Sequence, residues 1–140
     1  MGKQRSYESD DITVYFDGSR CIHAARCVHG LPTVFNAEAR PWIQPTQSSA
    51  DEIAKVVGQC PSGALTYERR DGGPAEAVQE EVTITAAKDG PLYLRGTISV
   101  VDQDGRPVEA RGRMALCRCG ASKNKPFCDN SHIESGFTSA

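Results

Sequence analysis

Alternating apolar and polar positions open the first half of the chain. Ile12–Phe16 is β-branched or aromatic and alternates, so it predicts a strand, with Asp17-Gly18 as the turn that follows. A short helix is expected from about Ala24 to Val28, because Gly30 and Pro32 stop it. Arg40–Gln44, bounded by prolines, predicts a short strand at a sheet edge.

The strongest helical pattern follows. Ile53, Val56 and Val57 fall at i, i+3 and i+4 on one face, and the helix is expected to stop near Gly58. Ser49 is placed to cap its start, and Glu52 three residues later completes a capping-box pattern. A last strand is expected at 65–67.

The second half is rich in predicted strands. Alternating runs at 82–85, 92–94 and 98–101 predict a β-meander that leads into a cysteine-rich loop, with Asp-Gly-containing turns after the first run and after the third. The polar stretch around Gly72-Gly73-Pro74 predicts a linker. The expected organisation is a disordered tail at 1–10, a cluster-binding domain at 11–68, a linker at 69–81 and a second domain at 82–140.

Length and charge narrow the possible functions. Halves of about seventy residues have cores worth only ~3–5 kcal/mol, so a metal or disulfide is expected to stabilise them. The net charge of −2 argues against a nucleic-acid partner. The polar start resembles no secretory signal, and no apolar run is long enough for a membrane helix, so we expect a cytoplasmic protein. There the six cysteines are expected to bind metal.

Three cysteines and one histidine form a candidate metal site near the C-terminus: Cys117, Cys119, Cys128 and His132. Alternate residues of an extended segment point to the same side, which brings the first two thiols together. This ligand set suits structural zinc as well as an iron–sulfur cluster. Zinc sites commonly begin with Cys-x2–4-Cys, so the Cys-x-Cys spacing favours iron–sulfur.

This loop resembles the CDGSH iron–sulfur domain of the mitoNEET family, whose signature is Cys-x-Cys-x2-Ser/Thr-x3-Pro-x-Cys-Asp-Gly-Ser/Ala/Thr-His. The one departure is Asn130 in place of Gly, and Asn tolerates the left-handed backbone that this turn needs. The matching positions are Cys117, Cys119, Ser122, Pro126, Cys128, Asp129, Ser131 and His132.

The resemblance implies a [2Fe–2S] cluster, with Cys117 and Cys119 on one iron and Cys128 and His132 on the other. It also implies a homodimer whose subunits exchange strands. A neutral imidazole raises the reduction potential, and its protonation would break an iron bond, so His132 is a candidate labile ligand. Asp129 is either a hydrogen-bond acceptor in the turn or simply a turn residue.

A second cysteine set lies in the first half. Cys21, Cys27 and the Cys60-Pro61 pair follow the pattern of a one-cluster bacterial ferredoxin, with Ala24 where the middle cysteine would stand. Three thiolates suit a [3Fe–4S] cluster, or a [4Fe–4S] cluster with another fourth ligand. His23 is the nearest candidate for that ligand and His29 a more distant one; Arg20 and Arg26 are candidates for offsetting the cluster's charge.

This half resembles the divergent single-cluster ferredoxin domains of bacteria, some of which are fused to a CDGSH domain. The resemblance implies an α+β protein, with an N-terminal ferredoxin-like β-α-β-β-α-β unit followed by a β-rich CDGSH domain.

Two unlike clusters in one small protein favour electron transfer as its function. The sequence carries no nucleophile–base pair, phosphate loop or suitably spaced carboxylate pair, so we expect a one-electron carrier between a reductase and an acceptor rather than an enzyme. The alternatives are a redox- or pH-responsive sensor or cluster-transfer protein that uses the His132 bond, and a zinc-binding interaction module.

Overall fold

Two compact units make up the chain, at residues 1–77 and 78–140. The computed structural model describes residues 4–22, 24–76, 80–108 and 112–139. The division between the units falls inside the stretch 69–81 that the sequence predicts as a linker. No helix in these residues is long and apolar enough to cross a membrane. The chain is an α+β protein in which strands predominate over helices.

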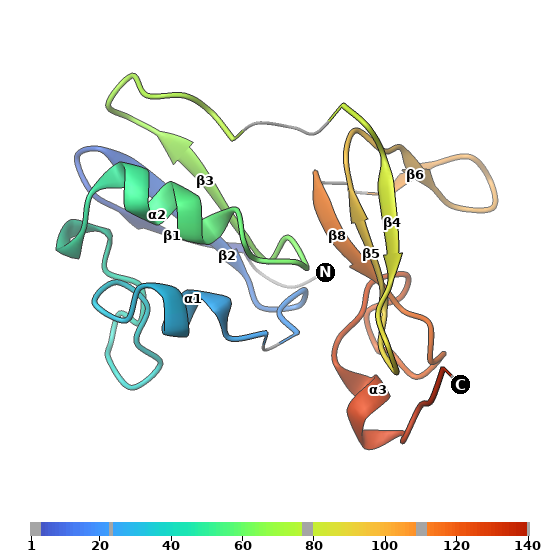
Figure 1. The fold of residues 1–140 in the computed structure, drawn as a ribbon. Helices are drawn as coiled ribbons and strands as arrows, with labels where there is room; N and C mark the ends of the chain where they lie inside the picture. The colour runs from blue at the N-terminus through green and yellow to red at the C-terminus, as the bar shows by residue number, and fades with distance from the viewer. Residues whose placement is uncertain (1–3, 23, 77–79, 109–111, 140) are drawn as a thin grey trace. The chain divides into compact units, whose positions relative to one another are not determined.

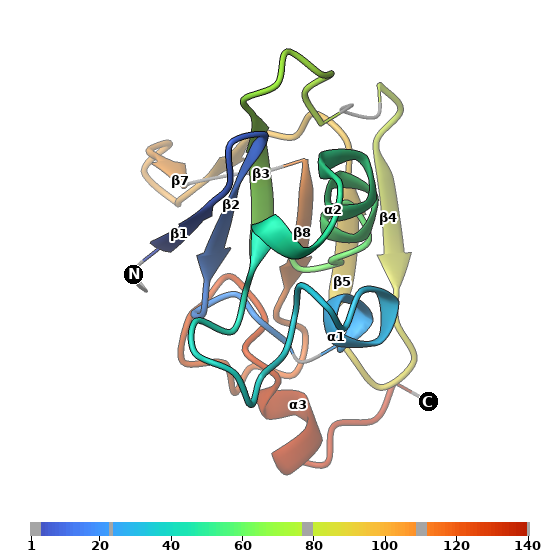
Figure 2. The same cartoon turned by 90° about the vertical axis from the view of Figure 1, so that its left-hand side faces the viewer.

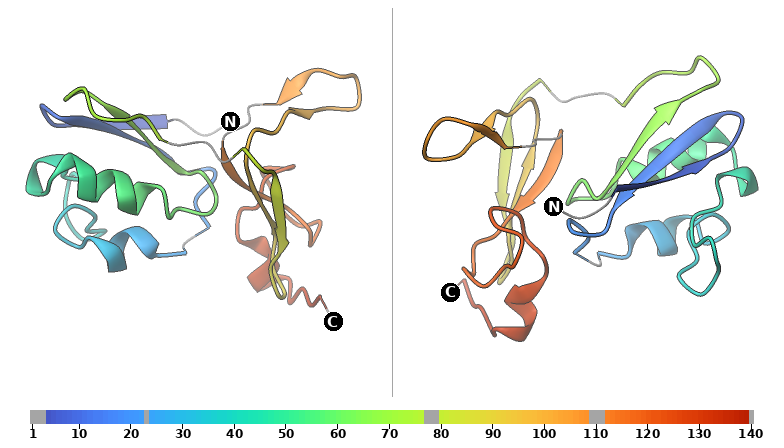
Figure 3. Two further views of the ribbon diagram at one scale, coloured as in Figure 1. Left: turned by 45° about the horizontal axis from the view of Figure 1, so that its top comes forward. Right: turned by 180° about the vertical axis from the view of Figure 1, so that it is seen from behind.

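The first unit is a three-stranded antiparallel sheet in the order β1-β2-β3, formed by Gln4–Glu8, Ile12–Asp17 and Leu65–Arg69. Its helices, α1 (Arg26–Gly30) and α2 (Ala50–Val57), lie on one face of this sheet (Figures 1 and 3). A short 3-10 turn, η1, occupies Pro45–Gln47. The core between the sheet and α2 contains fully buried Ile12, Val14, Ile43, Ile53 and Val57.

Two expectations for this unit are wrong. Gln4–Glu8, predicted as disordered, forms the edge strand β1 and pairs with β2 over its whole length. Arg40–Gln44 forms no strand of the main sheet; Ile43 makes one isolated bridge to Phe35. Pro41 and Pro45, which flank this bridge, have no N–H to extend a ladder. The described order is therefore β-β-α-α-β rather than β-α-β-β-α-β.

Helix α2 is confirmed, and its start differs from the prediction in one respect. The Ser49 side chain accepts the backbone N–H of Glu52 at 3.3 Å, as an N-cap does. The Glu52 carboxylate does not return to Ser49; it accepts the hydroxyl of Ser48 at 2.5 Å. The helix ends at Gly58 and leads directly to Cys60, so its position sets that of the thiol.

The second unit contains an antiparallel sheet in the order β4-β5-β8, formed by Thr83–Ala86, Leu92–Arg95 and Arg113–Leu116 (Figure 2). The predicted third strand of the meander does not join it. Instead β6 (Val100–Val101) pairs with β7 (Pro107–Val108) in a separate two-residue hairpin. The buried core cluster that the second unit's described residues form contains Leu94, Met114 and Phe127. Helix α3 (Ser131–Glu134) follows the cysteine loop.

Candidate metal centres

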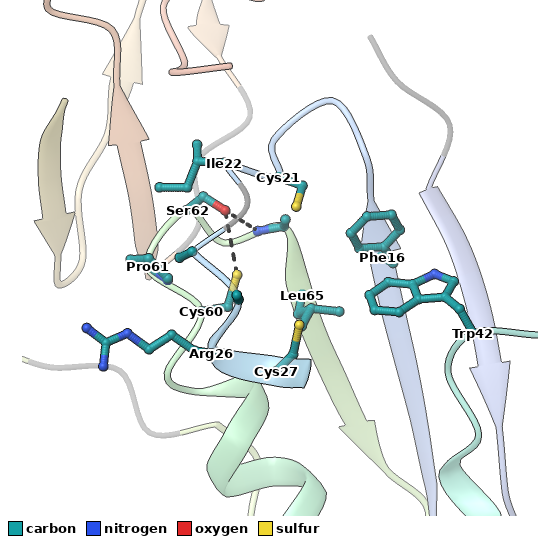
Figure 4. Close-up of a pocket in the computed structure, with 13 residues that line it drawn as sticks. Phe16, Cys21, Ile22, Arg26, Cys27, Trp42, Cys60, Pro61, Ser62 and Leu65 are labelled. Atoms are coloured by element: carbon teal, nitrogen blue, oxygen red, sulfur yellow. Dashed lines mark hydrogen bonds between the residues drawn. The ribbon is translucent and has the colours of Figure 1, made fainter. Parts of the chain in front are cut away.

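The three N-terminal cysteines lie around one pocket (Figure 4). Cys21 lies in the loop after β2, Cys27 in α1, and Cys60 between α2 and β3. Residues almost forty positions apart therefore meet because β2 and β3 are paired and α2 returns the chain to the start of β3. The structure brings together the three thiols that the sequence singled out.

Aromatic rings form one wall of this pocket. Phe16 and Trp42 pack edge to face with centroids 5.0 Å apart, on the side of Cys21 and Cys27 that faces away from Cys60 (Figure 4). Buried Ile22 and Leu65 also line the pocket. These apolar side chains lower the local dielectric constant, so a charge among the thiols interacts more strongly with its neighbours than it would in water.

Burial raises the pKa of the Cys27 thiol, and the neighbouring Cys60 and Cys21 thiols raise it further by charge repulsion. Three thiolates in such a pocket need a positive partner, which a metal ion or cluster supplies.

Ser62 contacts one of these cysteines directly. Its hydroxyl lies 3.5 Å from Cys60 Sγ, and its oxygen accepts the backbone N–H of Ala64 at 3.2 Å. The Ser62 residue is only 2% exposed. Because the oxygen already accepts one bond, its proton is available to donate to the Cys60 sulfur. The sequence analysis missed this residue, although its position two residues after a candidate ligand was a usable signal.

No described side chain other than the cysteines offers a metal ligand of ordinary type to this pocket. Its lining includes Ala24, at the position of the missing cysteine, but no described His, Asp or Glu. His23 lies outside the described residues, and His29 is exposed on α1 and does not line the pocket. The Arg26 side chain extends away from the thiols (Figure 4), which leaves it poorly placed to offset their charge.

The C-terminal site begins where β8 ends. Cys117 donates its backbone N–H to Pro126 O at 2.8 Å, and the Cys128 N–H bonds to Ala115 O at 2.8 Å, which aligns the two arms of the loop. Ser122 fastens the loop between them: its hydroxyl donates to Phe127 O at 2.6 Å.

The turn before His132 forms as predicted. Asn130 adopts φ 79°, a left-handed conformation, and begins α3. The Asp129 carboxylate accepts the Ser131 hydroxyl and the Lys123 N–H at 2.5 and 2.9 Å. These bonds lower the pKa of Asp129, the Ser131 hydroxyl most. Asp129 is thus a hydrogen-bonding turn residue.

The four donor atoms form two close pairs. Cys117 Sγ and Cys119 Sγ are 3.8 Å apart, and Cys128 Sγ and His132 Nδ1 are 3.5 Å apart. Ordinary ligand lengths at one tetrahedral metal give separations of about 3.8 Å for two thiolates and about 3.5 Å for a thiolate and an imidazole. Among all described residues, no three His, Cys, Asp or Glu side chains converge on a position for a single ion. Each pair therefore has the separation expected for two ligands on one metal ion.

Backbone N–H groups point at these sulfurs. Those of Ala121 and Asn130 donate to Cys119 Sγ and Cys128 Sγ, each at 3.4 Å. Burial works to raise the pKa of Cys117, but backbone N–H groups of Ser122 and Gly120 outweigh it and the pKa is lowered. Burial raises the pKa of Cys128 despite the bond from Asn130.

Comparison with known proteins agrees with both sites. Residues 7–70 match the family described as a divergent 4Fe-4S mono-cluster, and residues 89–133 match the iron-binding zinc finger of CDGSH type. The chain belongs to the divergent 4Fe–4S mono-cluster family, fused to a CDGSH domain. It is 39% identical to the uncharacterized protein YjdI of Escherichia coli strains K12 and O157:H7 over 69 residues, which is 49% of this chain and 91% of that protein.

Within the CDGSH domain, Arg118 ties the cysteine loop to the turn between β4 and β5. Its guanidinium donates to Gly90 O at 3.0 Å and to Ala87 O at 2.5 Å, and it lies 5.3 Å from the centroid of the Phe137 ring. Gly90 in turn approaches the imidazole closely, because a Cβ there would be 3.7 Å from His132 Nε2. Arg118 thus connects the Cys117–Cys119 segment to the turn whose Gly90 lies beside His132.

Proposed function

We propose that the protein is a one-electron carrier with two unlike iron–sulfur clusters. The CDGSH domain would hold a [2Fe–2S] cluster through Cys117, Cys119, Cys128 and His132. The mono-cluster domain would hold a [4Fe–4S] or [3Fe–4S] cluster through Cys21, Cys27 and Cys60. The observation that carries the proposal is the sorting of six cysteines into two donor sets of different geometry, one of them in two metal-sized pairs.

Such clusters accept and release one electron at a time with little rearrangement. The protein's own groups hold them in place and adjust their charge. At the first site, apolar side chains lower the local dielectric constant and the Ser62 hydroxyl stabilises thiolate charge, and at the second site backbone N–H groups do the same. We propose no enzymatic reaction, because the thiol–imidazole pair of Cys128 and His132 is assigned to the [2Fe–2S] cluster.

The family resemblance also leads us to propose a strand-exchanged homodimer in the cytoplasm. Val82 and Ile84, beside and within strand β4, are 48% and 61% exposed, and a second copy could cover them. A reducing compartment keeps the six free thiols available for metal.

Spectroscopy of protein purified without oxygen tests the proposal. Two sets of iron–sulfur EPR signals are expected, of which Cys27→Ser removes one and Cys128→Ser the other. Both couples should be reversible over repeated cycles. Colourless protein loaded with zinc would refute the clusters. Loss of iron in each cycle would refute the carrier and favour the cluster donor or sensor.

A three-iron signal in the oxidised protein would identify the first cluster as [3Fe–4S]; its absence would favour [4Fe–4S].

A further inference from the structure

An open groove adjoins the thiol pocket of the mono-cluster domain. Phe16 and Trp42 line both the pocket and the groove, and so do Cys21 and Cys27. The aromatic pair and two of the thiols therefore belong to both the pocket and the open groove. A protein seated in this groove would lie directly beside Cys21 and Cys27.

The charged residues that line the groove are all basic. Arg5 comes from β1 and Arg40 from the loop before Trp42, and no acidic residue is among the lining side chains. Glu38 lies in the same loop as Arg40 but does not line the groove. Among the described residues, the ion pairs use Arg69 and Arg70 and leave Arg5 and Arg40 without a carboxylate.

The opposite end of this unit has the reverse charge. It is defined by the β1–β2 turn, the end of β3 and the start of α2, which the Arg69–Asp51 ion pair brings together. Carboxylates outnumber the two arginines there: they are Glu8, Asp10, Asp11, Asp51, Glu52, Glu68 and Asp71. The charged side chains that line the groove are thus basic, whereas those at the opposite end of the unit are mostly acidic.

We propose that this groove is the docking surface for a redox protein with an acidic face. The inference rests on the proposed electron-carrier function and adds the partner's chemistry. Arg5 and Arg40 would attract a negatively charged partner toward the groove and hold it over the Phe16–Trp42 wall. Arginine and aromatic residues are the types enriched at protein interfaces.

Stopped-flow reduction of the full-length, cluster-loaded protein tests this surface. The donor is a reduced acidic flavodoxin, and rapid-freeze EPR follows the mono-cluster signal. We expect the rate constant to fall steeply as salt is raised, because screening removes steering. Arg5→Glu should lower it roughly tenfold at low salt. Lys55→Glu, an equal charge change on exposed α2 outside the groove, should leave it nearly unchanged.

A reduced zwitterionic viologen serves as the second donor and separates the two proposals. With a single sulfonate arm, its one-electron-reduced radical carries no net charge, so it should reduce all variants equally fast. If it reduces wild type reversibly while Arg5→Glu and Lys55→Glu respond alike to flavodoxin, the docking surface is refuted and the carrier stands. A flavodoxin rate independent of salt refutes the surface as well. If the viologen cannot cycle the cluster, the carrier function itself fails.

Discussion

Replacing Ser62 by alanine should lower the reduction potential of the mono-cluster site. The Ser62 hydroxyl lies 3.5 Å from Cys60 Sγ at a position that is 2% exposed, and it is the donor whenever Cys60 is a thiolate. A donor stabilises thiolate charge, and reduction of a cluster increases the charge on its sulfurs. Removing the donor therefore destabilises the reduced state more than the oxidised state, and the potential falls.

The magnitude follows from the strength of this bond. Hydrogen bonds to charged groups contribute about 1.5–3 kcal/mol, and the bond here is long for an O–H donor but buried. One electron and about 1.4 kcal/mol correspond to ~59 mV, so a fully differential bond would be worth ~60–130 mV. Since the thiolate is charged in both states, only part of this counts, and we expect a fall of roughly 30–60 mV.

An EPR-monitored redox titration measures this shift. Ser62→Thr keeps the hydroxyl and should restore the wild-type potential. Ser48→Ala removes a hydroxyl that donates to Glu52 instead of a cysteine, so it should have no effect. A Ser62→Ala potential equal to that of wild type, with the cluster fully loaded, would refute the argument. The variant should also be less stable by about 1–3 kcal/mol, because the Ala64 N–H loses its acceptor.

Other features give further predictions. Trp42, the single tryptophan, lines the thiol pocket, so loading the first site should quench its fluorescence; Cys27→Ser should abolish the quenching and Cys128→Ser should not. Arg118→Ala removes two bonds to the β4–β5 turn and should speed iron release from the CDGSH site to a chelator about tenfold, with Arg118→Lys intermediate; equal rates would refute the link. Ile53→Ala, at a fully buried position, should destabilise the first unit by about 2–5 kcal/mol and leave the CDGSH spectrum intact. The control Ile133→Ala, at a position 66% exposed, should change stability by less than about 0.5 kcal/mol. Loss of both clusters in Ile53→Ala would contradict two independent units.

Local chemistry made the sites easier to predict than the sheets. The left-handed turn at Asn130 and the cap at Ser49 follow from residue type and near neighbours, and both are confirmed. The gathering of Cys21, Cys27 and Cys60 needed only the ferredoxin-like spacing. The role of Ser62 could not be predicted from the sequence, because it depends on burial and on the bond that its oxygen accepts from the Ala64 N–H.

Strand pairing was predicted less well, because it depends on partners distant in sequence. Gln4–Glu8 is polar and exposed along most of its length, so no hydrophobic pattern indicated a strand; β2 supplies the backbone partners that make it one. In the second unit, 98–101 alternates like its neighbours, but β8 takes the place beside β5. Local alternation predicts that a strand exists but leaves open which strand it joins.

The unequal cores of the two units have a consequence for how the protein is made and turned over. The first unit buries a large apolar cluster around Ile53, whereas the buried cluster that the described residues of the second unit form contains Leu94, Met114 and Phe127. A domain with so little apolar core draws much of its folding free energy from bound metal. In chains synthesised when iron is scarce, the second half would therefore unfold more readily than the first and be the more open to proteases. Abundance in the cell would then follow iron supply, with no regulator needed.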